Sequence, residues 1–425
     1  MTIDSLYSLF LSSNGVSTDT RTLQPGQIFF ALKGENFNGD TYAAAALEKG
    51  AAIAVVSESC EGDDPRFVRV PDTLETLKAL AAHHRRQLDI PVIGLTGTNG
   101  KTTTKELIRT VLSVRYKVTA TKGNLNNDIG VPLSVLSIRP EAEIAVIEMG
   151  ANHPDDIGRL TPVSQPDYGL ITNVGKAHLL GFGSFEGVKK AKGMLYDYLA
   201  EHGGTAFLNV DDPDLTEMTL ERHLPVIRYG LQYDNAEILP LEPEHPFLRL
   251  SLGGITVETG LVGAYNAVNV LAALAVGAQF GVDPEDGAKA ISAYEPHNNR
   301  SEMTRTADNT VIADAYNANP SSMKVALDNL EAFSAPRKAV LLGMMGELGA
   351  ESLKEHQALV DRLSAMNLDK VYLVGEEFRR TGTSFPCFAT SADLAAYLGE
   401  HPLKGYTILL KGSRSTAMEK ILPVL

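Results

Sequence analysis

A glycine-rich loop that ends in Gly-Lys-Thr carries the clearest chemistry in this sequence. The loop, GLTGTNGKTTTK, follows the apolar run IPVI and opens a helical pattern, the setting that a phosphate-binding loop requires. Its glycines let backbone N–H groups turn toward phosphate oxygens, and the helix N-terminus adds partial positive charge. We expect Lys101 to reach the β- and γ-phosphates of a nucleotide and the Thr102 hydroxyl to bind Mg²⁺. The residues predicted to contact the nucleotide here are Gly97, Thr98, Asn99, Gly100, Lys101, Thr102 and Thr103.

The loop departs from the strict P-loop pattern, because Leu95 stands where the first glycine belongs. One alternative is a glycine-rich turn between a strand and a helix that binds no ligand. Another is a regulatory GTPase, but that class needs an Asn-Lys-x-Asp type of string to read the base, and the sequence has none. The Gly-Lys-Thr ending favours phosphate binding, since packing alone does not require it.

Two further polar residues follow apolar strand-like runs. Glu148 ends the run EIAVIEM, and His178 lies in the loop after DYGLIT. Ligands of α/β folds bind beyond the carboxyl ends of the strands, and a carboxylate there suits a hard Mg²⁺ ion. The alternatives are an exposed carboxylate at a strand end and a solvated loop histidine.

The elements that must position these residues follow an α/β order. The runs PVIGLTG, EIAVIEM, DYGLIT and TAFLNV alternate with helical segments, which predicts βαβ units on a parallel sheet. A hairpin-like stretch, FLRLSLGGITVETGLVG, and a long helix, YNAVNVLAALAVGAQFG, come next. After the linker-like EPHNNRSE the alternation restarts with TVIADAY, KAVLLGM, KVYLVG and YTILLKG. We therefore predict an α/β protein with domains at 1–85, 86–295 and 296–425.

Composition restricts the classes of partner. The 425 residues include 38 basic and 52 acidic side chains, a net charge of −14, which argues against nonspecific nucleic-acid binding. No apolar run approaches the roughly 20 residues needed to span a bilayer. Asp4 lies where a signal peptide needs basic residues, and two cysteines make no disulfide framework or zinc motif. We expect a cytoplasmic monomer that does not insert into membranes.

Motifs in a fixed order give the sequence a family resemblance. After the loop TGTNGKTT come KGNLNNDIGVP, EMG, NVGKAHL, AKG and YNAVN. This ordered set resembles the Mur ligases and their relatives, the folylpolyglutamate synthetases. The resemblance implies an ATP-dependent amide-bond ligase of peptidoglycan synthesis that works through an acyl phosphate. It also implies a small uridine-binding domain, a central ATP-binding domain and a C-terminal Rossmann-like domain.

The resemblance assigns the catalytic centre. It makes Lys101, Glu148, His178 and Lys192 catalytic, and it makes Thr102, Glu148, His178 and Lys192 the ligands of two Mg²⁺ ions. The lysine at the position of Lys192 is commonly carbamylated by CO₂ in the family, which needs a depressed pKa. Met194 follows Ala-Lys-Gly where the family often has an acid. Without the resemblance, a helical lysine would be expected on a solvated face.

The resemblance also implies contacts to the rest of ATP. Asn266 and Asn269 would lie near the base, although helix capping alone explains one of them. Arg300, after the linker, would reach ATP when the domains close, and Asp314 would meet the ribose. A linker charge and a strand-end carboxylate are the alternatives for this second pair.

Contacts to a UDP-muramoyl substrate are implied at two places. In the first domain they involve Ser17, Thr18, Asp19 and Arg21, and in the second Asn124, Asn126 and Asn127. A surface turn with an ion pair and an Asx-turn loop are the respective alternatives. Asp40 replaces the usual histidine after Phe-x-Gly, so a direct substrate contact there is not expected to follow the family.

The string Asp314-Ala-Tyr-Asn-Ala-Asn-Pro320 resembles the signature of the Mur ligases that add D-alanyl-D-alanine to a UDP-muramoyl-tripeptide. Tyr316, Asn317 and Asn319 would then surround the incoming dipeptide with hydroxyl and amide groups but no fixed positive charge. The strings around Glu347 and Arg414 match the same type, while Met344 replaces a usual aspartate and gets no role. The alternatives are a ligase that adds a diamino acid, which typically carries Asp-Asn-Pro-Arg-Lys, and a folylpolyglutamate synthetase-like ligase.

Overall fold

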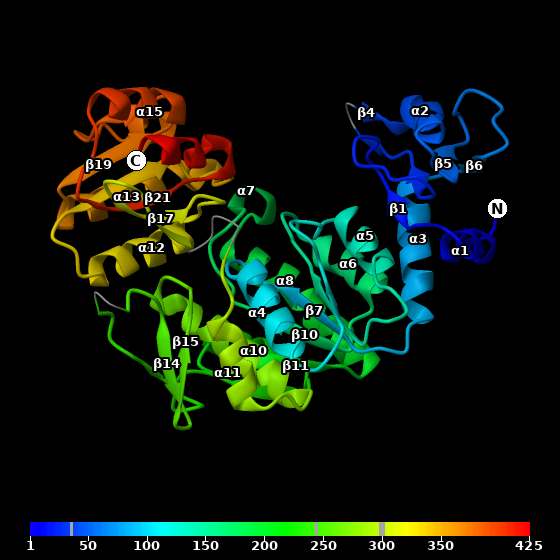
Figure 1. The fold of residues 1–425 in the computed structure, drawn as a ribbon, viewed down its shortest axis with the longest axis horizontal. Helices are drawn as coiled ribbons and strands as arrows, with labels where there is room; N and C mark the ends of the chain where they lie inside the picture. Colours follow the sequence, from blue (N-terminus) through cyan, green and yellow to red (C-terminus); the bar gives the residue numbers. More distant parts are fainter. Residues whose placement is uncertain (35–36, 243–244, 297–301) are drawn as a thin grey trace.

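The computed structural model describes residues 1–34, 37–242, 245–296 and 302–425. Figure 1 shows an N-terminal part in blue and a C-terminal part in orange and red, standing on opposite sides of a central part. Each part is built around a parallel sheet, so the predicted α/β class with three domains is confirmed. The strands fall within the three predicted ranges, whose limits stay predictions. Arg300 lies outside the described residues.

The N-terminal part has a four-stranded parallel sheet with helices around it. Its strands, in sheet order, are β1 (Val16–Ser17), β2 (Ile28–Phe30), β5 (Ile53–Ser57) and β6 (Phe67–Val70). The remaining elements are α1 (Ile3–Leu11), β3 (Lys33–Gly34), β4 (Phe37–Asn38), η1 (Gly39–Tyr42), α2 (Ala43–Glu48) and α3 (Thr73–Arg86).

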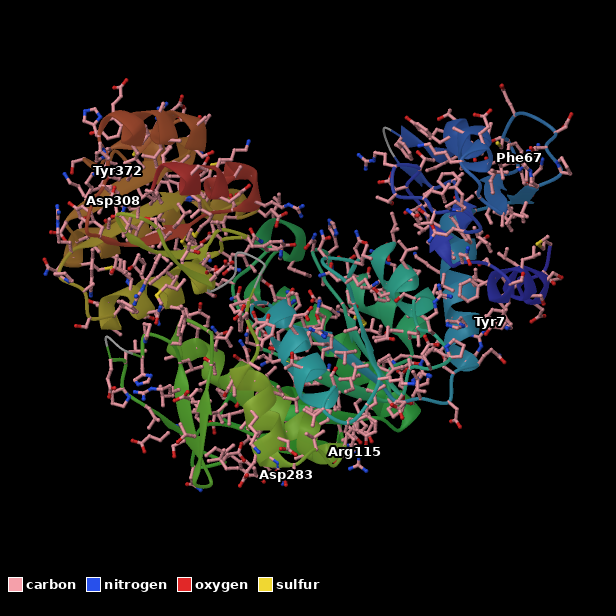
Figure 2. The ribbon with its side chains drawn as sticks, viewed as in Figure 1. Tyr7, Phe67, Arg115, Asp283, Asp308 and Tyr372 are labelled. Carbon is pink, nitrogen blue, oxygen red and sulfur yellow. The ribbon has the colours of Figure 1, made fainter. Side chains whose placement is uncertain are left out.

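Helix α3 joins the N-terminal part to the central part. Asp72 caps it by accepting hydrogen bonds from the N–H groups of Leu74 and Glu75. On one side α3 packs against α1, which carries Tyr7 (Figure 2). The Tyr7 hydroxyl lies 3.2 Å from His84 Nδ1 of α3. On the other side α3 contacts α5 (Gly130–Leu136) and α6 (Asp156–Ser164) of the central part. One apolar core therefore continues from the first sheet into the second.

The central sheet is six-stranded and parallel throughout. In sheet order its strands are β12 (Val226–Tyr229), β11 (Thr205–Asn209), β10 (Tyr168–Ile171), β7 (Val92–Thr96), β9 (Ile144–Glu148) and β8 (Val118–Ala120). Helices cover both faces, so β7 and β9 are buried throughout and their sequences are continuous apolar runs. One face packs on α5, α6 and α8 (Phe185–His202), the other on α4 (Lys101–Leu112) and α10 (Ala267–Gln279).

The predicted hairpin and long helix are both present. Strands β14 (Arg249–Leu252) and β15 (Ile255–Glu258) are antiparallel, and β13 (Glu237–Ile238) adds a third strand. The long helix is α10, and α11 (Pro284–Ser292) follows it. In the described part of the chain no helix is both long enough and apolar enough to cross a membrane.

The C-terminal part has a second six-stranded sheet, in which only the edge strand β16 is antiparallel. The sheet order is β16 (Glu302–Arg305), β17 (Thr310–Asp314), β21 (Thr407–Lys411), β18 (Lys338–Gly343), β19 (Lys370–Val374) and β20 (Cys387–Phe388). Its main helices are α12 (Pro320–Ala332), α13 (Ser352–Ala365) and α15 (Ser391–Glu400). Asp314 and Lys411 end neighbouring strands and are partners in the register.

Candidate active site

The phosphate loop joins β7 to α4, and its geometry requires glycine at two positions. Gly97 and Gly100 have φ angles of 149° and 81°, in the region that favours glycine. A Cβ on Gly97 would lie 1.9 Å from Thr172 Oγ1, and one on Gly100 would lie 2.9 Å from Asn269 Oδ1. Without side chains, the backbone N–H groups of the loop can approach a phosphate closely at the start of α4.

Hydrogen bonds from the segment after β10 hold the loop in place. Asn173 accepts from the N–H groups of Thr98 and Asn99, each at 3.0 Å, through its carbonyl and its side-chain oxygen respectively. Thr172 Oγ1 donates to the Asn99 carbonyl at 2.6 Å. Lys101 Nζ donates to the carbonyls of Gly97 and Thr98 at 2.7 and 3.1 Å. The ammonium is therefore kept at the mouth of the loop, where phosphates would lie.

Glu148 lies beside the loop with a nearly buried side chain. The Thr102 hydroxyl donates to its two oxygens at 3.1 and 3.3 Å, and Asn126 Nδ2 donates at 2.8 Å. Lys105 Nζ is 3.9 Å from Glu148 Oε2 and donates to the Thr121 carbonyl at 2.6 Å. The predicted proximity of Glu148 and Thr102 is thus present.

This oxygen-rich pair fits a magnesium ion. Within the described ranges no three His, Cys, Asp or Glu side chains form a complete metal cage. Mg²⁺ rarely needs one, because it keeps several waters and is usually bound by one or two carboxylates together with substrate phosphates. A buried carboxylate next to a loop hydroxyl supplies the protein side of such a site.

His178 lies in the same cleft and is held by the C-terminal part. It is the residue before the short helix α7 (Leu179–Phe182), and its Nδ1 is hydrogen-bonded to Glu347 Oε2. Burial lowers the pKa of His178, the Lys101 ammonium lowers it further, and the Glu347 carboxylate opposes both effects. The histidine is therefore not the solvated residue that a lone loop position suggests.

Lys192 is buried on α8, so the expectation of a solvated face is wrong for this lysine. Its side chain is 2% exposed, and its Nζ lies 5.9 Å from the centre of the Phe182 ring. Among the described residues, no acceptor lies within hydrogen-bond distance of the amine and no carboxylate lies within ion-pair distance of it. Burial lowers the pKa of Lys192 well below its ordinary value, the Lys101 ammonium lowers it further, and the more distant Asp156 carboxylate does not offset them. A neutral amine, as carbamylation requires, is therefore favoured.

A cleft of about 480 Å³ brings most of the predicted nucleotide residues together. It is lined by the phosphate loop, Glu148, His178, Asn266, Asn269 and Asp314. Asn269 Nδ2 donates to Asn266 Oδ1 at 2.9 Å, and Asn266 Nδ2 donates to the Val262 carbonyl. Asn266 is the residue before α10, but its side chain makes no capping bond, so capping does not explain either asparagine.

The C-terminal part closes the other side of this cleft. Asn319 Nδ2 donates to Asn99 Oδ1 at 2.9 Å. Asp314 pairs with the buried Lys411 at 2.5 Å, a cation for which the sequence analysis gave no role. The signal that could have found Lys411 is its position at the end of a strand next to the one that Asp314 ends.

A second cleft, of about 890 Å³, runs along α4 and ends at the C-terminal part. Thr102, Lys105 and Asn124 line it on one side, Tyr316 and Arg414 on the other. The Arg414 guanidinium lies 5.8 Å from the centre of the Tyr316 ring, and no carboxylate of the described residues is within ion-pair distance of it. Arg414 therefore places a fixed positive charge beside Tyr316, and the sequence analysis gave this arginine no role.

The three asparagines of the segment 122–132 make contacts of different kinds. Asn126 reaches Glu148, and Asn124 lines the second cleft. Asn127 Oδ1 accepts from the N–H groups of Ile129 and Gly130 at 3.3 and 2.9 Å, which is the Asx-turn alternative.

The predicted residues of the first domain lie on the N-terminal part, across the molecule from the C-terminal part (Figure 1). Arg21 makes a bidentate ion pair with Asp19, whose pKa falls to about 2 mainly through this hydrogen bonding. Ser17 Oγ accepts from the Asp19 N–H, and Thr18 is partly exposed between them. Both features match the surface-turn alternative, and the exposed Arg21 could still turn to an anion.

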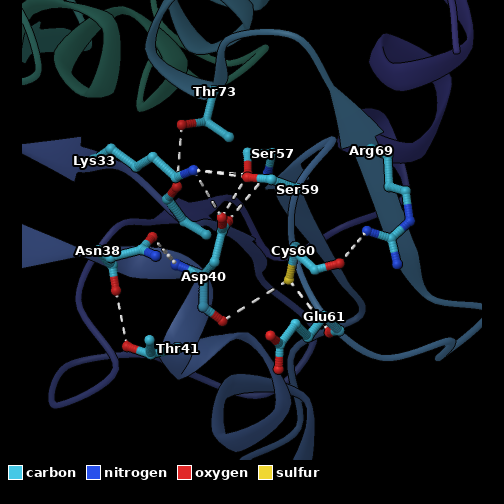
Figure 3. Close-up of polar contacts among 11 residues, drawn as sticks. Lys33, Asn38, Asp40, Thr41, Ser57, Ser59, Cys60, Glu61, Arg69 and Thr73 are labelled. Carbon is cyan, nitrogen blue, oxygen red and sulfur yellow. Dashed lines mark hydrogen bonds and ion pairs between the residues drawn. The ribbon is translucent and has the colours of Figure 1, made fainter.

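Asp40, the departure from the family pattern, points into the domain (Figure 3). Its carboxylate accepts from the Ser57 N–H at 3.0 Å and the Ser57 hydroxyl at 2.5 Å, and Lys33 Nζ lies 3.2 Å away. Burial acts to raise the pKa of Asp40, but these partners outweigh it and lower the pKa. Asp40 thus fastens η1 to β5.

Comparisons with known proteins follow the same three-part division. Family models match at residues 12–85 (Mur ligase family, catalytic domain), 95–277 (Mur ligase middle domain) and 299–414 (Mur ligase, glutamate ligase domain). The UDP-N-acetylmuramoyl-tripeptide--D-alanyl-D-alanine ligase of Escherichia coli (strain K12) is 35% identical, over 98% of this chain and 94% of its own.

Two solved structures have the same fold over nearly the whole chain. MurF from Acinetobacter baumannii is 31% identical with a TM-score of 0.85, covering 98% of this chain and 97% of its own. MurF ligase from Thermotoga maritima, in complex with ADP, is 27% identical with a TM-score of 0.85 and the same coverage.

Proposed function

Because this chain belongs to the Mur ligase family, we propose that it is an ATP-dependent ligase of peptidoglycan synthesis in the cytoplasm. It joins D-alanyl-D-alanine to a UDP-N-acetylmuramoyl-tripeptide. The observation that carries the proposal is the hydrogen bond between Asn319 and Asn99. Asn319 belongs to the string 314–320, which distinguishes the dipeptide-adding ligases, and this hydrogen bond places that string in contact with the phosphate loop.

The cleft of about 480 Å³ is the ATP site. The N–H groups of the loop and Lys101 bind the phosphates, Asn266 and Asn269 lie at the base, and Asp314 meets the ribose. Thr102, Glu148 and His178 would hold Mg²⁺, which neutralises charge on the phosphates when bound. These groups supply the positive potential that a chain with a net charge of −14 lacks overall.

The reaction needs no covalent bond to the enzyme. A carboxylate oxygen of the muramoyl peptide attacks the γ-phosphorus of ATP, and the bond to ADP breaks. The amine of the dipeptide attacks the acyl carbon of the resulting acyl phosphate, loses a proton, and inorganic phosphate leaves. Lys101 and the loop amides stabilise the negative charge of the phosphoryl transfer. The cleft between two domains excludes water, which would hydrolyse the acyl phosphate.

Lys192 supplies an oxygen ligand after modification. Its neutral, buried amine takes up CO₂ with loss of one proton, which forms a carbamate. The cations of the surrounding site, including Lys101, would balance the new negative charge.

The incoming dipeptide binds at Tyr316, which lines both clefts. Asn317 and Asn319, which line the first cleft, donate hydrogen bonds to it, and Arg414 in the second cleft binds the terminal carboxylate. The uridine-linked end of the other substrate lies toward Arg21 and the turn at 17–19, with Asn126 and Asn124 along its path.

A phosphate-release assay tests the function. Phosphate should appear from ATP only when both the UDP-muramoyl-tripeptide and D-alanyl-D-alanine are present. Lysine or diaminopimelate with the UDP-muramoyl-dipeptide should give little turnover, because a wrong amine leaves buried polar groups unpaired. Turnover with a diamino acid and none with the dipeptide would reassign the chain to the ligases that add the third residue.

A further inference from the structure

Glu347 makes a contact from the C-terminal part to a predicted metal ligand. Its Oε2 is hydrogen-bonded to His178 Nδ1. His178 lies in a loop of the central sheet, and Glu347 lies in a loop of the C-terminal sheet. Both residues have positive φ angles, 60° and 51°, which non-glycine residues rarely adopt. Such conformations persist where the surrounding structure fixes them.

Several neighbours fix the segment that carries Glu347. The Leu180 N–H donates to the Glu347 carbonyl at 3.1 Å, and His356 Nε2 accepts from the Met345 N–H at 3.0 Å. Lys176 and Glu355 form an ion pair at 3.2 Å across the same interface. The Glu347 side chain is 56% exposed, but the docked segment that carries it holds its carboxylate against the imidazole.

The contact decides which ring nitrogen of His178 can bind a metal. A carboxylate accepts hydrogen bonds, so the nitrogen facing it carries the proton, and Nε2 keeps its lone pair. Metal-binding histidines usually donate their other N–H to a carboxylate in this way, which fixes the ring and raises its basicity. Here the carboxylate comes from a different domain than the histidine.

We propose that Glu347 is a positioning residue that acts through His178: it orients the imidazole so that Nε2 faces the cleft and binds the second metal ion. The proposal rests on the proposed function, because that function supplies the metal. It adds that this metal site is complete only when the C-terminal part is docked. The metal ion that neutralises charge at the phosphates would therefore be fully bound only when the domains close.

Mn²⁺ binding, followed by electron paramagnetic resonance with a non-hydrolysable ATP analogue, tests this on the full chain. We expect Glu347→Ala to weaken one of two Mn²⁺ sites by about 10- to 100-fold. Glu347→Gln should weaken it less, because the amide oxygen still accepts from Nδ1. Glu351→Ala, which removes an exposed carboxylate that pairs with Lys354 within the C-terminal part, is the matched control and should leave both sites unchanged.

A double-mutant cycle separates action through His178 from a general effect on docking. His178→Ala should weaken the same Mn²⁺ site, and adding Glu347→Ala should cost nothing more. Full-strength binding of both ions by Glu347→Ala would overturn the proposal, as would additive effects in the double mutant. Because binding is measured without turnover, either result leaves the phosphate-release test of the ligase function independent.

Discussion

Asn319 lies 2.9 Å from Asn99, with the Nδ2 group of the first donating to the Oδ1 of the second. The same Asn319 caps α12: its Oδ1 accepts from the Ser322 N–H at 2.8 Å, and Ser322 Oγ accepts from the Asn319 N–H at 3.0 Å. One amide side chain therefore starts a helix with its oxygen and reaches the phosphate loop with its nitrogen. These two roles can be separated by substitution.

The first prediction concerns the two ends of this amide. Asn319→Asp should keep the cap, because aspartate caps as well as asparagine, but it cannot donate to Asn99. We expect an unchanged melting temperature and a fall of about 10- to 100-fold in kcat/KM for ATP, the size of a lost hydrogen bond with a new anion beside the phosphates. Asn319→Ser, also a good cap but neutral, should show a smaller fall. Equal activity in all three proteins would contradict the proposed link.

The second prediction concerns the charge at the mouth of the loop. Lys101→Ala should lower kcat by about 100- to 1000-fold, because a preorganised cation is lost where negative charge develops. Stopped assays of ADP formation and a circular dichroism spectrum would show the loss of rate in a folded protein. Lys117→Ala, at an exposed position, is the control. Near-normal turnover of Lys101→Ala would remove the loop from the mechanism.

Lys192 gives a third prediction. Lys192→Ala should be nearly inactive, and formate should restore part of the activity by placing carboxylate oxygens in the space that the side chain leaves. Lys190→Ala, an exposed lysine on the same helix, should behave as wild type with and without formate. Mass spectrometry after trapping of the carbamate would identify the modified residue. An active alanine variant would end the carbamate proposal and leave the ligase assignment standing.

The fourth prediction is a pH dependence of the segment at 344–349. Burial lowers the pKa of His356, whose Nε2 accepts from the Met345 N–H. The stability from this neutral ring is complete above the ordinary pKa of about 6.5. It is lost as the pH falls from there through the lower pKa of the folded state. Hydrogen–deuterium exchange of the peptide should therefore rise below pH 6.5, after correction for intrinsic rates, and His356→Gln should abolish the change. A flat profile in the wild type would refute the prediction.

The sequence was sufficient to predict which side chains meet when they lie at the strand ends of one sheet. Lys101 follows β7 and Glu148 ends β9. These strands are parallel neighbours, so the proximity of the two residues follows from the α/β pattern. The contacts between sheets could not be predicted in this way. His178 and Glu347 are 169 residues apart, and Asn99 and Asn319 are 220 apart. These contacts depend on how the domains dock, which no local pattern records.

Burial of single side chains was the other limit. Three lysines lie close together on α8, and helical periodicity does not say which of them is buried. Lys189 pairs with Asp214 and Glu217, Lys190 is exposed, and Lys192 is enclosed. The string around Arg414 matched the dipeptide-adding ligases, but the sequence gave this arginine no role. Its position beside Tyr316, which follows a different strand, is seen only in the structure.

The last prediction tests whether Arg414 recognises the terminal carboxylate of the dipeptide. D-alanyl-D-alanine amide has the same amine as the natural dipeptide but no terminal carboxylate. We expect the wild type to prefer the acid by about 10- to 100-fold in kcat/KM, the size of a charge-assisted hydrogen bond. Arg414→Gln should lose this preference by raising KM for the acid, with KM for ATP unchanged.

Two substitutions refine that test. Arg414→Lys keeps the charge but not the planar pair of donors, so it should recover only part of the preference. Arg109→Gln removes another cation of the same cleft, one that already pairs with Glu106, and should leave discrimination between acid and amide intact. If Arg414→Gln still prefers the acid as strongly as the wild type does, the carboxylate is bound elsewhere. If Arg109→Gln loses the preference equally, the cleft acts through its overall potential and not through one guanidinium.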